Sequence, residues 1–383
     1  MFELRKFVIP EFIFGVGARH KVGVYVRNLN ARKVLIVSDP GVIAAGWLQE
    51  LQDNLDEAGV RHILFDQVTP NPRDHEVMAG VALYHQAACD VIVALGGGSV
   101  IDCAKGISVI ASNGGHILDY EGVDAIPLPG QPLICIPTTA GTAADISQFA
   151  IINAIERRTK IAIISKIVVP DVALVDPETT LTMPADLTAF TGLDALTHAI
   201  EAFVSSASSP MSDVHALAAI RGVRQHLLAA VSNPGDLVAR EQMMLASLQA
   251  GMAFSNASLG ATHAMAHSLG GYLDLPHGEC NALLLPAVVD FNYNGAEERF
   301  IQIGLALGLD MKRGNSAQKL LRIMDDINGL RHQVGIKGGL ADRGVSSGSV
   351  PDLAEHAIRD SCIYTNPRRA SRSDLRTIYA EAL

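Results

Sequence analysis

Aspartate and histidine side chains recur at a helical spacing in the second half of the chain. Asp194 and His198 lie four residues apart, and His263 and His267 repeat that spacing. Residues four apart share one face of a helix, separated by one turn. His277 follows in a Pro-His-Gly segment that is typical of a turn. Because buried polar groups in such apolar segments need partners, the pattern predicts a metal site.

The residue types restrict which ion this site takes. One carboxylate with several imidazoles, and no thiolate, suits a borderline divalent ion such as Fe²⁺ or Zn²⁺. The competing interpretation of a buried histidine is a core residue satisfied by hydrogen bonds. Some histidines have no such partner at helical spacing, and we interpret them as structural or surface residues: His215, His226, His332 and His356.

A glycine-rich segment in the first half follows a short apolar run. Gly96–Ser99 reads Gly-Gly-Gly-Ser, comes after the predicted strand Asp90–Leu95 and precedes a helical segment. Glycines allow the backbone to approach a pyrophosphate, and a helix N-terminus favours its charge. The segment therefore indicates a phosphate site, although a plain tight turn explains the same four residues.

Polar residues also follow two other predicted strands. Thr138, Thr139 and Thr142 come after the apolar run 132–137, and Asp39 ends the run 33–39. Open parallel sheets bind ligands at the carboxyl ends of their strands, and a carboxylate there binds a ribose 2′-hydroxyl and repels a 2′-phosphate. This interpretation favours NAD over NADP. The alternatives are a polar turn that caps the strand and, for Asp39, an ordinary turn residue before Pro40.

The pattern of elements supplies the scaffold for these groups. Up to about residue 180, apolar runs alternate with helical segments, which is typical of an α/β domain with a parallel sheet. Prolines and threonines near that point read as a linker, and the rest of the chain is helical in pattern. We expect an α/β dinucleotide-binding domain over residues 1–180 and an all-α metal-binding and substrate domain over residues 181–383.

Composition narrows the function classes. The 383 residues carry a formal net charge of −10 without a cluster of Lys or Arg, so a nucleic-acid surface is not expected. Five scattered cysteines without a Cys-x-x-Cys pair favour a reducing compartment. No stretch approaches the roughly 18 apolar residues of a membrane helix, and the N-terminus is a poor signal peptide. The prediction is a soluble, cytoplasmic protein.

Taken together in their order along the chain, these motifs match those of a known family over nearly the whole sequence. The sequence resembles the iron-containing (group III) alcohol dehydrogenases. The resemblance lies in the Gly-Gly-Gly-Ser loop with Asp102 and Lys105, Pro137–Thr142, Asp194–Ala202, His263–His267, Pro276–Pro286 and Asn366–Arg368.

The resemblance implies specific roles for residues of this chain. The implied metal ligands are Asp194, His198, His263 and His277, with His267 beside them as the catalytic proton-relay residue. The implied NAD-binding residues are Gly96, Gly97, Gly98 and Ser99 at the pyrophosphate, Asp39 at the ribose, and Asp102, Thr138, Thr139, Thr142 and Lys160. Phe149, Phe254 and Cys362 correspond to residues that line the substrate pocket.

The activity implied is that of an NAD-linked alcohol dehydrogenase or aldehyde reductase for short-chain primary alcohols or diols. Hydride would pass to NAD from an alkoxide on Fe²⁺, with Zn²⁺ as the alternative ion, in a homo-oligomeric enzyme. One alternative is a lyase of the same fold, similar to dehydroquinate synthase, which needs a basic cluster. From Asp194 to His277 the basic residues are only Arg221, Arg224 and Arg240, and none adjoins an implied ligand. The other alternative is an inactive NAD-binding subunit.

Overall fold

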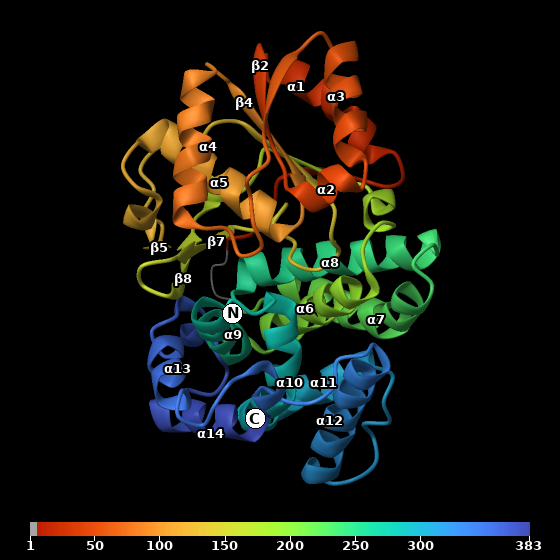
Figure 1. Ribbon diagram of the computed structural model, residues 1–383. Coiled ribbons are helices and arrows are strands. Elements are labelled where there is room, and N and C mark those ends of the chain that lie inside the picture. The colour runs from red at the N-terminus through yellow and green to blue at the C-terminus, as the bar shows by residue number, and fades with distance from the viewer. Residues whose placement is uncertain (1–5) are drawn as a thin grey trace. The chain divides into compact units, whose positions relative to one another are not determined.

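The computed structural model describes residues 6–383, which form two compact units. The N-terminal unit comprises Val8–Met183, and the helical unit comprises Pro184–Leu383 together with Lys6 and Phe7. Figure 1 shows the N-terminal unit in red to yellow-green and the helical unit in green to blue. The segment around residue 180, which the sequence analysis interprets as a linker, is a 3-10 helix, η4 (Pro177–Thr180). Its Thr179 hydroxyl donates to the Pro137 and Asp176 carbonyls, so the segment is tied to the N-terminal unit.

A parallel sheet of six strands forms the centre of the N-terminal unit. Its strand order is β1-β9-β6-β4-β2-β3, and every adjacent pair runs parallel. The strands are β1 (Glu11–Phe14), β2 (Lys33–Val37), β3 (Arg61–Phe65), β4 (Val91–Gly96), β6 (Leu133–Pro137) and β9 (Val172–Val175). The helices are α1 (Val22–Asn28), α2 (Pro40–Ala44), α3 (Trp47–Glu57), α4 (Asp74–Gln86) and α5 (Gly98–Asn113).

Alternation along the strands builds a core on each face of this sheet. Val34 and Ile36 of β2 join one apolar cluster with residues of α1 and α3. Leu35 and Val37 join another cluster with residues of α4 and α5. Successive side chains of a strand point to opposite faces, so a continuous apolar run is what a sheet covered on both sides requires.

A second, smaller sheet is not anticipated by the sequence analysis. Its order is β5-β8-β7, with β5 (Gly122–Val123), β7 (Phe149–Ala154) and β8 (Thr159–Ile164), and β7 pairs antiparallel with β8. The inward residues of this hairpin pack in the same cluster as α4 and α5. The hairpin is therefore fixed by tertiary packing against that face of the unit.

Helices make up the regular structure of the helical unit as far as the structure describes it. They are α6 (Ala185–Val204), α7 (Pro210–Ser232), α8 (Leu237–Ala257), α9 (Ala261–Leu273), α10 (His277–Tyr293), α11 (Glu297–Ala306), α12 (Ser316–Gln333), α13 (Val350–Ala357) and α14 (Arg372–Ala382), with short 3-10 turns between them. Helix α6 packs against α7, α8 and α10, and nearly all of its residues from Thr188 to Val204 are buried. A helix that is apolar on all sides belongs in a core, and its few polar residues therefore need a reason to be there.

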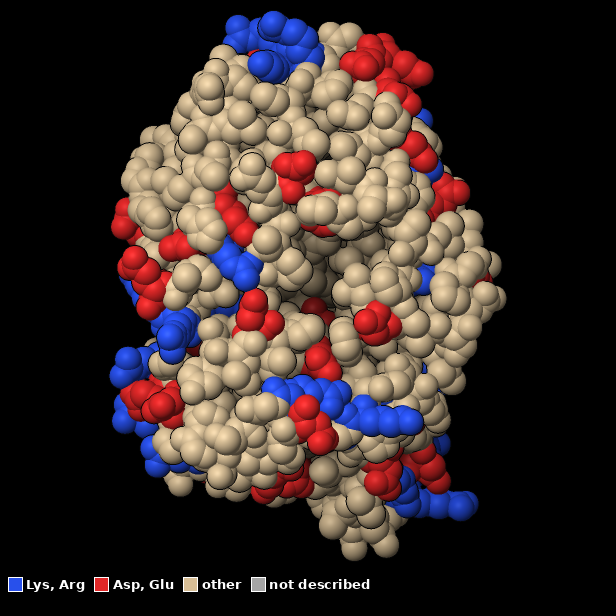
Figure 2. Space-filling model, in the orientation of Figure 1, with Lys and Arg blue, Asp and Glu red and all other residues tan. Residues whose placement is uncertain are grey.

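The helices, the cysteines and the surface charge each show one general property of the molecule. Across residues 6–383, no helix combines the length and the apolarity needed to cross a membrane. All five cysteines are buried and free of disulfides. On the face drawn in Figure 2, Lys and Arg occur in small groups interspersed with Asp and Glu.

Candidate functional site

Two of the predicted ligands project from the buried middle of α6. Asp194 is 1% exposed and His198 is 4% exposed. Their four-residue spacing brings His198 Nδ1 to 3.8 Å from Asp194 Oδ2. The His198 ring stacks on Phe254 of α8 and on His263 of α9, with centroid separations of 4.2 and 4.4 Å. Packing on both faces of the ring fixes its plane.

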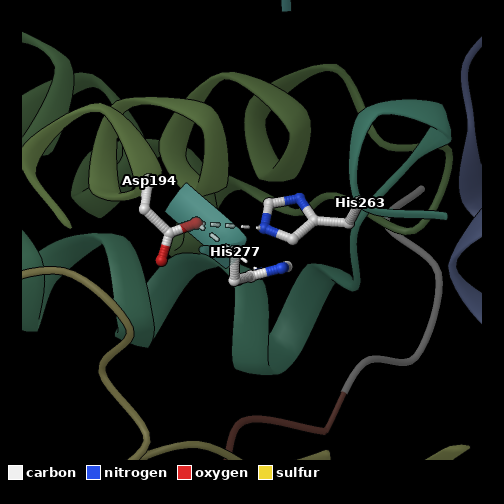
Figure 3. A group of neighbouring side chains, drawn as sticks. All are labelled: Asp194, His263 and His277. Atoms are coloured by element: carbon white, nitrogen blue, oxygen red, sulfur yellow. Dashed lines mark ion pairs between the residues drawn. The ribbon is translucent and has the colours of Figure 1, made fainter. Parts of the chain in front are cut away.

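The other two predicted ligands come from the starts of α9 and α10. His263 Nε2 lies 3.6 Å from Asp194 Oδ1, and His277 Nε2 lies 3.8 Å from the same oxygen. Figure 3 shows the three side chains pointing toward one another. One potential ligand atom from each lies within 4.8 Å of the others, a spacing that a single ion can bridge. The structure thus gathers residues separated by up to 83 positions in sequence.

The side-chain amide of Asn281 lies among the candidate ligand atoms of this cluster. Its Nδ2 donates to Asp194 Oδ1 at 2.7 Å and lies 3.1 Å from His263 Nε2 and 3.2 Å from His277 Nε2. One amide nitrogen thus meets three potential metal-ligand atoms. Its Oδ1 is buried without a hydrogen-bond partner among the described residues. Lone pairs that converge in this way fit a divalent cation.

The electrostatics of the cluster agree with that fit. Burial alone would raise the pKa of Asp194, but His198, His277 and His263 hold its pKa well below the usual range. Burial opposes charge on His263, yet hydrogen bonds with Asp194 and Glu201 raise its pKa to about 9. Without a metal, the positively charged form of His263 is therefore favoured, and a metal ion takes the place of its second ring proton.

Glu201 is a functional candidate that the sequence analysis missed. It lies on α6, seven residues after Asp194, and its Oε2 is 2.6 Å from His263 Nδ1. Positions i, i+4 and i+7 fall on one helical face, so Asp194, His198 and Glu201 share the buried side of α6 that faces α9. The same periodicity that picks out the first two residues was a signal for the third.

His267 lies beside the cluster, as the resemblance implies. Its ring stacks on His277 with the centroids 5.2 Å apart. Its Nδ1 lies 2.8 Å from Asp360 Oδ2, and Asp360 is a second residue that sequence reasoning missed. No local pattern links two residues 93 positions apart. Cys362 belongs to the same group, and burial raises its pKa well above the ordinary value, so it is a neutral thiol.

In the N-terminal unit, the phosphate-binding candidates lie where the order of the sheet reverses. From β2 the chain proceeds outward to β3, and from β4 it proceeds to β6 on the other side, while β2 and β4 are neighbours. Open α/β sheets bind nucleotides outside such a switch point. Gly96 ends β4, and helix α5 already begins at Gly98, so Ser99 belongs to its first turn.

The structure brings the glycine segment and the threonine segment together. A Cβ at Gly97 would lie 3.0 Å from Thr139 Cγ2, and one at Gly98 would lie 2.8 Å from Thr142 Oγ1. A side chain at either position would therefore press on these threonines, and glycine permits the close approach. Thr138 is buried beside them on the loop after β6, and its backbone N–H donates to the Gly96 carbonyl.

Asn71, which sequence reasoning missed, connects Lys160 and Ser99 through two hydrogen bonds. Lys160 Nζ donates to Asn71 Oδ1 at 2.7 Å, and the Asn71 backbone N–H donates to Ser99 Oγ at 3.2 Å. Asn71 has a positive φ of 57°, a conformation that asparagine tolerates better than most residues. The Pro-Asn-Pro context marks a turn but not this partnership.

Asp102 and Asp39 have structural contacts of their own. Asp102 Oδ2 accepts the Ile151 N–H from β7, its Oδ1 is buried without a partner among the described residues, and burial raises its pKa to about 6. Asp39 caps α2, since its Oδ1 accepts the N–H groups of Gly41 and Val42. The contacts of Oδ1 thus agree with the interpretation of Asp39 as a turn residue. Its ribose-binding role stays a prediction.

The predicted substrate-pocket residues are all buried. Phe149 belongs to β7 in the N-terminal unit, where its carbonyl accepts a hydrogen bond from Lys105 Nζ. Phe254 stacks on His198, and Cys362 lies with His267 and Asp360, so these two adjoin the candidate metal cluster of the helical unit. Their contact with a substrate stays a prediction.

Comparisons with known proteins identify the family of this chain. Residues 10–177 match the iron-containing alcohol dehydrogenase family model, and residues 188–383 match the C-terminal model of the Fe-containing alcohol dehydrogenase family. Alcohol dehydrogenase 4 of Schizosaccharomyces pombe is 42% identical over 98% of this chain and 89% of the relative. The NAD-dependent methanol dehydrogenase of Bacillus methanolicus is 38% identical, covering 98% of this chain and 99% of the relative. A solved structure of 1,3-propanediol oxidoreductase superposes with a TM-score of 0.96 at 37% identity, covering 100% of both chains.

The chain belongs to the iron-containing alcohol dehydrogenase family. The family and fold class predicted from the sequence are confirmed, and so is the general activity of an alcohol oxidoreductase.

Proposed function

We propose that this protein is a metal-dependent, NAD-linked alcohol dehydrogenase and aldehyde reductase for short-chain primary alcohols or diols. The observation that carries the proposal is the convergence of buried Asp194 and His263 with partly buried His277, beside His198. Relatives named for methanol and for 1,3-propanediol support the substrate class, and one of them is named as NAD-dependent.

The proposed metal ligands are Asp194, His198, His263 and His277. Their donor set suits Fe²⁺, with Zn²⁺ as the alternative, because imidazole and carboxylate bind both. When bound, the divalent ion supplies Lewis acidity that lowers the pKa of an alcohol hydroxyl, and NAD accepts the hydride. The protein's part is to hold ligands and substrate in a dry site, and the buried ligands of α6 and α9 satisfy that condition.

The proposed dinucleotide site lies at the switch point of the parallel sheet. Gly97 and Gly98 let Thr139 and Thr142 lie close to the loop before α5, and the N-terminus of α5 offers free N–H groups to the pyrophosphate. Gly96, Ser99, Thr138, Thr139, Thr142, Asp102 and Lys160 complete the proposed set. Asp39 at the end of β2 selects NAD because its negative charge repels a 2′-phosphate.

We propose that His267 exchanges the proton of the reaction with the substrate. Because Asp360 accepts a hydrogen bond from Nδ1, the neutral ring of His267 keeps its lone pair on Nε2. That atom takes a proton when an alcohol is oxidised and returns it when an aldehyde is reduced.

The basic residues between Asp194 and His277 give no support to the lyase alternative. Arg224 pairs with Asp326, and buried Arg240 donates to Thr188 Oγ1 and to the Pro234 carbonyl. These two cations are thus engaged with other groups of the helical unit. The lining proposed from Phe149, Phe254 and Cys362 is apolar or weakly polar, which suits a neutral alcohol better than a carboxylated sugar.

We further propose that the enzyme works in the cytoplasm as a homo-oligomer. Five buried thiols without a disulfide support a reducing compartment. The assembly is proposed from the family resemblance alone, and sedimentation of the purified protein tests it.

The first experiment follows NADH absorbance in protein stripped of metal and then supplied with Fe²⁺ or Zn²⁺. Ethanol, 1-propanol, 1,3-propanediol and 1,2-propanediol are offered in turn, and the matching aldehydes test the reverse reaction. We expect turnover that appears only after metal is added. Absence of turnover in both directions with both ions would favour the lyase or the inactive subunit.

A further inference from the structure

The Glu201 carboxylate lies at the N-terminus of α9, where it meets several donors at once. It accepts the backbone N–H of Gly260 at 3.0 Å and that of Thr262 at 2.6 Å. His263 Nδ1 is 2.6 Å from its Oε2. Glu201 is 3% exposed, so water does not compete for these contacts.

These contacts complete the capping of α9. The first N–H groups of a helix have no partner within it, and a carboxylate is favoured there by the helix dipole. Glu201 accepts hydrogen bonds from the N–H groups of Gly260 and Thr262. The Asn366 side chain accepts one from the N–H group of Ala261, which lies between them. A Cβ at Gly260 would lie 3.0 Å from Glu201 Oε1 and 2.8 Å from Asn366 Oδ1. The glycine lets both caps approach.

The hydrogen-bond roles at Glu201 leave one arrangement for His263. An ionised carboxylate only accepts, and backbone N–H groups only donate. His263 Nδ1 must therefore be protonated and donate a hydrogen bond to Glu201. The opposite ring atom, Nε2, faces Asp194 Oδ1 at 3.6 Å and is the atom left to bind an ion.

We propose that Glu201 is a positioning residue of the metal centre, which fixes the orientation and tautomer of His263 so that Nε2 points at the ion. The inference rests on the proposed metal site and adds to it a residue outside the ligand set. A carboxylate behind a ligating imidazole also raises the basicity of the ligand. Glutamate thus links the cap of α9 to the ligand that α9 carries.

Glutamine has the same shape as glutamate, but either placement of its amide loses a contact that the carboxylate makes. Its amide has one oxygen and one NH₂ group, and the position is surrounded by donors. The NH₂ group must face either a backbone N–H or the imidazole. If it faces the imidazole, Nδ1 must become the acceptor, and the proton moves to Nε2, the atom needed for the metal.

The test compares metal binding in the full-length wild-type protein, Glu201→Gln and a matched control, Asn366→Ala. The control removes a cap from the same helix end without touching the His263 ring. Zn²⁺ dissociation constants come from competition with a chelator, and the absorption spectrum of the Co²⁺-loaded protein reports the ligand field. Thermal unfolding of each metal-free protein measures the purely structural effect.

We expect Glu201→Gln to bind Zn²⁺ roughly 10–100-fold more weakly, with an altered Co²⁺ spectrum. We expect Asn366→Ala to lower the unfolding temperature while its dissociation constant stays within about threefold of wild type, since the contribution of a cap is to the helix. Glu201→Asp keeps the charge and replaces the glutamine variant if that variant does not fold. Its affinity for Zn²⁺ should fall between those of wild type and Glu201→Gln.

Two results would overturn the inference, and a third bears on the proposed site itself. If Glu201→Gln and Glu201→Asp bind as tightly as wild type, the carboxylate does not position His263. If Asn366→Ala loses as much affinity as Glu201→Gln, the effect is only that of a weakened helix end. If the wild-type protein itself binds no Zn²⁺, Co²⁺ or Fe²⁺, the metal site fails, and the role of Glu201 fails with it.

Discussion

Asp102 provides a quantitative test of the electrostatics in the N-terminal unit. Its carboxylate has one hydrogen bond, from the Ile151 N–H, and one buried oxygen without a partner among the described residues. Burial raises its pKa from 3.8 to about 6, against the opposing effect of Lys105. The ionised form present at neutral pH is therefore disfavoured in the folded protein.

The sign of the pH dependence follows from linkage. Because the folded pKa is the higher one, the contribution of Asp102 to stability is fully present below about pH 3.8 and is lost as the pH rises through about 6. The cost at pH 7 is about 3 kcal/mol, and at pH 5 it is roughly half of that. An asparagine side chain at this position has no such titration.

We therefore expect the stability of Asp102→Asn, relative to wild type, to rise by about 1 kcal/mol between pH 5 and pH 7. The buried amide of the variant adds a cost that does not depend on pH, so it cancels in this difference. Urea unfolding followed by fluorescence measures it, because Trp47 is the only tryptophan and lies in the same unit. Asp53→Asn, which changes an exposed carboxylate on α3, is the control. Equal stability differences at the two pH values would refute the reasoning.

Three further predictions concern the two candidate sites. His263→Ala should abolish metal-dependent turnover while NAD binding, measured by calorimetry, stays near wild type; His215→Ala on α7 is the control, and full activity of His263→Ala after metal stripping would contradict the ligand assignment. Gly98→Ala should weaken NAD binding and cost about 1–3 kcal/mol of stability, because its Cβ would lie 2.8 Å from Thr142 Oγ1. Thr142→Ala in the same chain should relieve the stability cost, and no relief would show that the clash is not the cause. Asp39→Ala should raise the ratio of NADP to NAD turnover and cost about 1 kcal/mol through the lost cap of α2; an unchanged cofactor ratio would count against its selecting role.

The sequence alone determined the local features of this protein. The apolar runs at Asp90–Leu95 and 132–137 indicated the buried strands β4 and β6, and helical spacing picked out Asp194 with His198 and His263 with His267. Such signals are local because they depend only on the two-residue period of a strand or the 3.6-residue period of a helix. The family resemblance then joined these pieces into one expected activity.

Only the tertiary structure decided which distant groups share a site. Asp360 meets His267 across 93 positions, Lys160 meets Asn71 across 89, and Glu201 reaches His263 across 62. Asn281 is close to its neighbour His277 in sequence, but its bond to Asp194 spans 87 positions. No periodicity encodes such pairs, because they depend on which helix packs beside which. The chemistry of the ligands was therefore visible in the sequence, whereas the groups that orient those ligands became visible only when α6, α9 and α10 were packed together.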